Sequence, residues 1–187
     1  MQRLLKTIIP LVAAALLSSC AGNGNSEKKS DMEAKANHEH AAMEQTTATS
    51  NTKPVLKNDK LNAIYQHYIH LTTALTNGDE AEAKVAAIAI EAGAKEVNGA
   101  SVISTSAAKI TEASGIEAQR KFYETMTNDM VELVKQEGLS SGELHIAYCP
   151  MAFDDKGASW ISGNKEIRNP YFGDKMINCG EVKETIK

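Results

Sequence analysis

The chain has 187 residues, a formal net charge of −4 and 42% hydrophobic residues. These values are typical of an ordinary globular domain and argue against a disordered or fibrous chain. The chain is mildly acidic and has no long basic run, so it lacks the cluster of positive charge that nucleic-acid binding usually requires. We therefore expect no nucleic-acid partner.

The N-terminal residues have the layout of a secretory signal. Arg3 and Lys6 precede an apolar stretch, 8–17, that is too short to span a bilayer as a mature helix. Leu17-Ser18-Ser19-Cys20 then resembles the bacterial lipobox, where signal peptidase cuts before a lipid-bearing cysteine. We predict a signal peptide over 1–19, a membrane anchor through lipid on Cys20, and a location in the cell envelope on the periplasmic or outer-membrane face. If the signal were cut elsewhere, Cys20 would be an ordinary thiol.

A flexible linker is predicted over residues 20–53. It consists mainly of small, polar and charged residues without an aromatic side chain, so it cannot bury enough apolar surface to offset its conformational entropy. His38, His40 and Met43 in this linker could catch a copper or zinc ion. A solvated polar run is the simpler interpretation. The folded domain is expected to cover 54–187.

The first two predicted helices form a tight hairpin. Apolar residues recur at three- and four-residue steps over 61–75, and Asn77-Gly78 then supplies a left-handed C-cap. Asp79 is expected to cap the second helix. The residues expected on its inward face are Val85, Ile88, Ala89 and Ala92.

Two more helices follow. Residues 102–113 predict a shorter, Ser- and Thr-rich helix, and the apolar stripe over 122–134 predicts a strong one that ends at Gly138. Four amphipathic helices with short connections favour a mainly α fold, an up-and-down four-helix bundle.

The pattern changes after Gly138. Leu144 to Cys149 alternate with a strand period, which places His145 most simply on a solvent-facing side. Prolines and glycines then interrupt the chain repeatedly. We expect a loop-rich C-terminal tail with one short strand, and we look for function there because five of the nine aromatic residues lie between Tyr148 and Phe172.

Two pairs of soft donors mark the tail, namely Cys149 with Met151 and Met176 with Cys179. Thiolate and thioether sulfurs suit a soft ion such as Cu(I) or Ag(I) better than magnesium, calcium or manganese. In an extended segment the first pair would point to one side, and on a helical turn the second would share a face. In an exported protein, however, Cys149 and Cys179 are also a candidate disulfide, and buried free thiols remain a third interpretation.

The tail also carries a family resemblance. Tyr148-Cys149-Pro150-Met151-Ala152, Lys156-Gly157-Ala158 with Trp160, Asn169-Pro170-Tyr171-Phe172-Gly173-Asp174-Lys175-Met176 and Cys179-Gly180-Glu181-Val182 resemble the end of bacterial domain of unknown function 3347. Over the helices the resemblance is looser. The family occurs as envelope lipoproteins or fused to adaptor subunits of copper and silver efflux pumps, so the resemblance implies heavy-metal handling. It does not decide between a metal site and a disulfide.

No pattern for catalysis is found in the sequence. A phosphate-binding glycine loop, a serine nucleophile elbow and a zinc-protease helix are all missing. His145 and Cys149 would lie roughly 13 Å apart along a strand, too far for a catalytic pair. We therefore expect no enzyme, but a lipid-anchored protein that binds Cu(I) or Ag(I) as an accessory to metal efflux, with an efflux adaptor as a partner. The alternative is a disulfide-pinned interaction module of the envelope.

Overall fold

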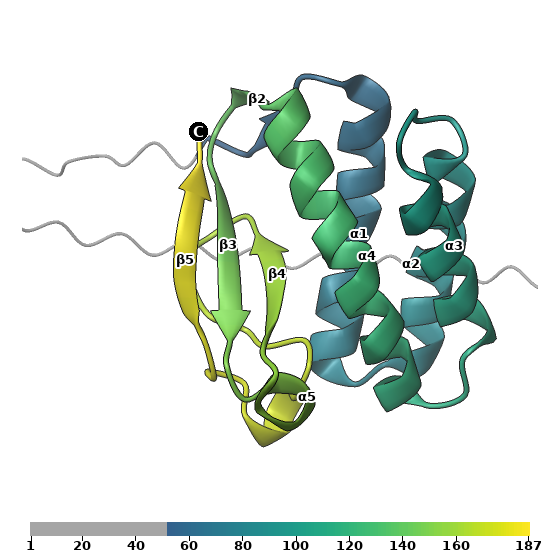
Figure 1. Cartoon of the computed structure of the whole chain (residues 1–187), viewed down its shortest axis with the longest axis vertical. Coiled ribbons are helices and arrows are strands. Elements are labelled where there is room, and N and C mark those ends of the chain that lie inside the picture. Colours follow the sequence, from purple (N-terminus) through teal and green to yellow (C-terminus); the bar gives the residue numbers. More distant parts are fainter. Residues whose placement is uncertain (1–51) are drawn as a thin grey trace, which may run out of the picture. The chain divides into compact units, whose positions relative to one another are not determined.

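A computed structural model describes residues 52–187 and shows four long helices followed by a small sheet (Figure 1). The predicted signal peptide, Cys20 and nearly all of the predicted linker fall outside this range. None of the helices within it is long and apolar enough to cross a membrane. The mainly helical fold class is confirmed. The helices are α1 (Asp59–Asn77), α2 (Glu80–Ala94), α3 (Ser101–Glu112) and α4 (Ile116–Glu137).

The first hairpin has the caps predicted at Gly78 and Asp79, together with an N-cap of α1 that was not predicted. The α1 N-cap is Asn58, whose side-chain oxygen accepts a hydrogen bond from the Leu61 N–H at 3.1 Å. Gly78 ends α1 in the left-handed conformation with φ 72°, which glycine adopts without steric cost. Asp79 then caps α2 by accepting from the Glu82 N–H at 2.9 Å.

The prediction for the inward face of α2 is wrong. Val85 and Ile88 are 57% and 55% exposed. The buried residues of α2 are instead Ala83, Ala86, Ala87, Ile90 and Ala94. Because α2 packs between α1 and α3, its small residues face the neighbouring helices and allow close approach. A β-carbon added to Gly93, for example, would lie 3.0 Å from Ile64.

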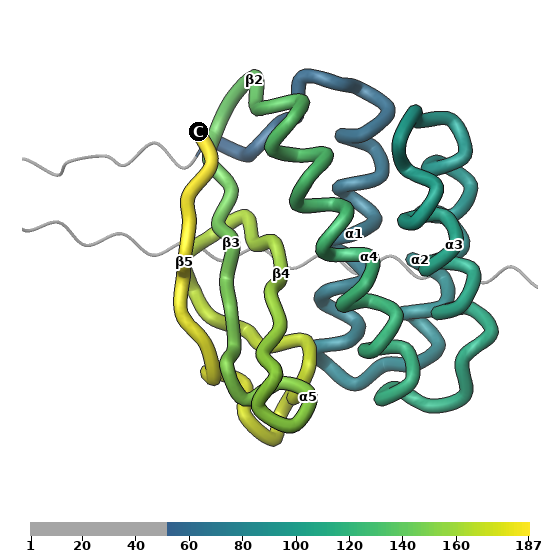
Figure 2. The backbone as a smooth tube through the Cα atoms, in the orientation of Figure 1, coloured from purple at the N-terminus to yellow at the C-terminus, as the bar shows by residue number. Residues whose placement is uncertain are grey.

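The tail contains more strand than the sequence predicted. The expected strand is confirmed as β3 (Leu144–Cys149). It is the centre of an antiparallel sheet in the order β4-β3-β5, with β4 (Ala158–Ser162) and β5 (Glu181–Ile186) on its two sides. Figure 2 traces the backbone through these three strands. A second ladder pairs β1 (Val55–Leu56) with β2 (Leu139–Ser141), while α5 (Ala152–Asp155) and η1 (Gly173–Lys175) are short turns.

His145 is not solvent-facing as predicted, because the strand that carries it is the central one. Its side chain is 2% exposed, and its Nδ1 lies 3.0 Å from the Thr185 hydroxyl on β5. Burial lowers its pKa, and the nearby Glu143 carboxylate acts in the opposite direction. His145 is therefore a packed residue of the sheet and not an open ligand.

Buried polar contacts fix the tail against the helices. The Tyr68 hydroxyl on α1 accepts a hydrogen bond from the Ile161 N–H on β4 at 3.1 Å, and it also bonds to Thr127 and Tyr123 of α4 at 2.9 and 2.8 Å. Arg120 of α4 donates to the carbonyl oxygens of Leu75 on α1 and Pro170 in the tail. Because a buried group that loses its partner pays the desolvation penalty, these contacts hold the sheet in one position on α1 and α4. The sheet thus lies on the opposite side of α1 and α4 from α2 and α3 (Figure 1).

Candidate functional site

The structure brings the two predicted cysteines of the tail together. Cys149 is the last residue of β3, where it pairs with Ala158 and is fully buried. Cys179 lies in the loop before β5 and is half-buried. Their Sγ atoms are 2.6 Å apart, closer than two non-bonded sulfur atoms approach and longer than the disulfide bond of about 2.05 Å. The two cysteines are therefore placed as a pair that a disulfide can close.

Asn169 holds the loop that carries Cys179. Its side-chain amide donates to the Cys179 carbonyl oxygen at 2.8 Å, and its backbone N–H donates to the Ile177 carbonyl oxygen at 2.8 Å. Its side-chain oxygen accepts from the N–H groups of Tyr171 and Phe172 at 2.7 and 3.2 Å. Asn169 is fully buried. No role for Asn169 was predicted, although it opens the Asn-Pro-Tyr-Phe motif of the family resemblance.

Arg120 fixes the same loop to the helices. Its Nε donates to the Pro170 carbonyl oxygen at 2.8 Å and its Nη2 to the Leu75 carbonyl oxygen at 2.9 Å. Nη1 forms an ion pair with Glu117 at 2.9 Å, which balances a charge whose side chain is only 4% exposed. The loop of Cys179 is thus positioned from both α1 and α4, which no pattern in the sequence indicates.

The neighbouring Cys149 has the largest effect on the pKa of the Cys179 thiol. Its hydrogen bond with Cys149, together with burial and the charge of Cys149, raises the pKa of the Cys179 thiol to about 11, and the Met151 backbone N–H partly opposes this shift. Cys179 therefore keeps its proton near neutral pH. A raised pKa does not favour a thiolate nucleophile.

The two methionines lie on the turns beside the cysteines, but not in the predicted arrangement. Met151 is in a helical turn conformation with φ −86° and ψ −7°, so the strand alternation that would align it with Cys149 has already ended. It is 47% exposed. Met176 follows η1, and its carbonyl oxygen accepts from the Cys179 N–H at 3.0 Å, so a turn joins these two residues instead of one helical face.

The turn after Met151 is strained. Phe153, Asp154 and Asp155 all have positive φ, at 53°, 56° and 63°. A left-handed residue other than glycine costs about 1–2 kcal/mol, and such strain concentrates at functional sites. Phe153 packs edge-on against Tyr171, with ring centroids 5.3 Å apart. A cavity of about 470 Å³ adjoins Met151, Phe153 and Tyr171, which leaves room for a ligand or partner to reach Met151.

Across residues 52–187 there is no group of three or more His, Cys, Asp or Glu side chains that could hold a metal ion. A site in this part of the chain would depend on the two thiols, with methionine as the further donor. The predicted linker ligands His38, His40 and Met43 lie outside the described residues.

These features define a small helical domain with an attached sheet that carries a pair of cysteines. Residues 64–142 match the family model described as Protein of unknown function (DUF3347). Searches of curated proteins and of solved structures returned no match. The matched residues run from α1 to the end of β2, so the match supports the DUF3347 family through the helices, where the resemblance was expected to be looser. The tail motifs lie beyond the matched range.

Proposed function

We propose that this protein is a non-catalytic accessory protein that binds Cu(I) or Ag(I) through Cys149 and Cys179. The observation that carries the proposal is the placement of the two cysteine sulfurs 2.6 Å apart, at the end of the central strand of a sheet that is fixed to the helices. Soft thiolate ligands select soft monovalent ions over hard cations.

Binding changes the pair in a defined way. Each thiol releases one proton as its sulfur binds the ion. Because two protons leave and one monovalent ion enters, the net charge of the site falls by one unit. With metal–sulfur bonds of about 2.3 Å, the two sulfurs must separate to roughly 4 Å. Cys149 lies in the central strand and Asn169 holds the backbone of Cys179, so the half-buried side chain of Cys179 supplies the movement.

The methionines complete the proposed site. Met151 is exposed beside the pair and adjoins the open cavity, which suits a ligand that meets the incoming ion first. Met176 on the second turn is the fourth donor of the proposed set. Both thioethers are soft and uncharged, so they add affinity for Cu(I) without a further proton to displace.

The proposed location of the protein and its proposed partner rest on the sequence. The lipobox at Cys20 supports a lipid-anchored protein of the cell envelope, on the periplasmic or outer-membrane face. The family resemblance supports a role beside copper and silver efflux, with a periplasmic adaptor as the partner that accepts the ion. A bound ion that is held partly by an exposed methionine can pass to such a partner by ligand exchange.

The contact of the thiols also favours a second function, a disulfide-pinned interaction module. Oxidation of Cys149 and Cys179 forms one S–S bond and releases two protons and two electrons, which a protein disulfide of the envelope accepts by thiol–disulfide exchange. The bond would pin the tail for docking an envelope partner. The two functions differ in whether the freshly isolated protein has free thiols, and thiol counting without reduction separates them.

A pH series tests the metal proposal. Because the pKa of Cys179 is raised to about 11, the ion must displace its proton across the neutral range. We expect the apparent Cu(I) affinity of the reduced full chain to rise about tenfold per pH unit between roughly pH 6 and pH 9 from Cys179 alone. The measurement is anaerobic competition with a colorimetric chelator, whose own pH dependence is calibrated in each buffer. An affinity that stays constant with pH would contradict binding by these thiols.

A further inference from the structure

The exposed side of α2 carries an apolar stripe that no other described residue covers. Ala81, Val85, Ile88 and Ala92 all lie on this side, and Val85 and Ile88 are 57% and 55% exposed. The spacing of four, three and four residues places them in one line along the helix. This is the seam by which two helices pack together in a coiled coil.

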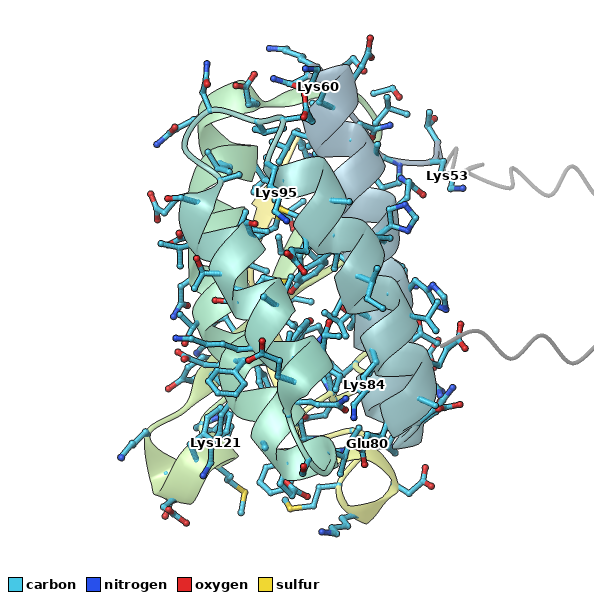
Figure 3. All side chains as sticks on the ribbon, turned by 90° about the vertical axis from the view of Figure 1, so that its right-hand side faces the viewer. Lys53, Lys60, Glu80, Lys84, Lys95 and Lys121 are labelled. Carbon is cyan, nitrogen blue, oxygen red and sulfur yellow. The ribbon has the colours of Figure 1, made fainter. Side chains whose placement is uncertain are left out.

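The charges beside the stripe form two ion pairs within α2, Lys84 with Glu80 at 3.1 Å and Lys95 with Glu91 at 2.7 Å, and their order along the helix also suits an identical, antiparallel helix. Glu80, Lys84, Glu91 and Lys95 lie on one flank of the stripe, and Figure 3 shows Glu80, Lys84 and Lys95 along the length of α2. A two-fold pairing centred between Val85 and Ile88 sets Val85 against Ile88 of the second copy. Lys84 then lies within one turn of Glu91 of that copy, and Lys95 within one turn of Glu80, so opposite charges meet.

We propose that α2 is the interface of a homodimer, formed by antiparallel packing of this stripe on the α2 stripe of a second copy. In a two-fold symmetric dimer both chains use the same patch, so α2 alone can form the interface and the assembly closes at two copies. The stripe spans only about 17 Å of helix, so the dimer is a weak one, with a dissociation constant of about 1–100 μM.

The proposed dimer does not cover the cysteine pair of either chain. The sheet with Cys149 lies on the opposite side of α1 and α4 from α2 (Figure 1). Two chains joined through α2 therefore present their metal sites outward on opposite sides. Since the interface and the dithiol share no residue, the dimer does not depend on the proposed metal function.

Sedimentation velocity of the reduced full chain tests the interface, with concentrations up to about 200 μM. We expect the parent to shift from monomer to dimer as its concentration rises. Val85→Gln with Ile88→Gln should keep the fold, because both side chains are exposed, and should weaken the dimer at least about tenfold. The control is Val55→Gln, which removes an exposed apolar side chain from β1 and should leave the dimer intact.

Charge exchange tests the orientation. Lys84→Glu should weaken the dimer, and adding Glu91→Lys to it should restore part of the loss, because the two residues meet only in an antiparallel pair. In a parallel pair the flanks that carry Lys84 and Glu91 would lie on opposite sides of the seam, so the two residues would not meet and the second change would not help. If the parent chain stays monomeric at the highest concentration, the stripe does not pair with a second copy and the proposal is wrong. A dimer that survives the double glutamine change would overturn it as well.

Discussion

Replacement of both Cys149 and Cys179 by serine is expected to weaken Cu(I) binding by about 1000-fold or more, because a hydroxyl is a poor donor for a soft ion. The measurement is chelator competition on the full chain under anaerobic, reducing conditions. Circular dichroism confirms that the variant is folded, since serine is close to cysteine in size.

The matched control is Cys20→Ser, which removes the third cysteine of the chain but leaves the tail unchanged. It should bind Cu(I) as the parent does. If the double variant kept the parent affinity while the control also did, the dithiol would not be the site. If only the control lost affinity, the binding thiol would be Cys20.

Oxidation of the reduced protein is expected to stabilise it strongly. A bond between Cys149 and Cys179 closes a loop of 30 residues. In the chain-entropy model such a closure adds about 3–4 kcal/mol to the free energy of unfolding, which raises the melting temperature by roughly 10 °C. Paired thermal unfolding of reduced and oxidised protein measures this difference.

The Cys149→Ser, Cys179→Ser variant provides the control, since an oxidant should leave its melting temperature unchanged. The oxidised parent should also fail to bind Cu(I), because a disulfide has no thiolate to offer. An oxidised parent that melts at the same temperature as the reduced one would contradict closure of this pair.

Local signals were sufficient to predict the helices. The caps at Gly78 and Asp79 and the strand over 144–149 depend on neighbouring residues, and the structure confirms them. The inward face of α2 could not be read in the same way. Its alanines and its larger apolar residues surround the helix, so periodicity alone does not show which face meets α1 and α3.

The missed strands have a different cause. β5 has the sequence Glu-Val-Lys-Glu-Thr-Ile, in which charged residues that are depleted in strands interrupt the strand-favouring Val, Thr and Ile. It pairs with β3, which lies far away in the sequence, and Lys135 of α4 forms an ion pair with its Glu184 at 2.7 Å. Such long-range pairing overrides local preference.

The candidate site was predicted in part. The residue types identified Cys149 and Cys179, and the structure places their sulfur atoms in contact. The prediction that Met151 aligns with Cys149 failed because the chain leaves the strand at Cys149 and enters the strained turn. Asn169 and Arg120 were missed because their roles depend on backbone oxygens of segments distant in sequence, which no spacing rule identifies.

X-ray absorption at the copper edge of the Cu(I)-loaded full chain distinguishes a sulfur site from a nitrogen site. We expect a first shell of sulfur atoms only, at about 2.3 Å, from Cys149 and Cys179 with methionine. The same spectrum should lose its sulfur shell in the double serine variant. A first shell of nitrogen atoms in the parent would place the ion on histidines such as His38 and His40, and would contradict the dithiol site.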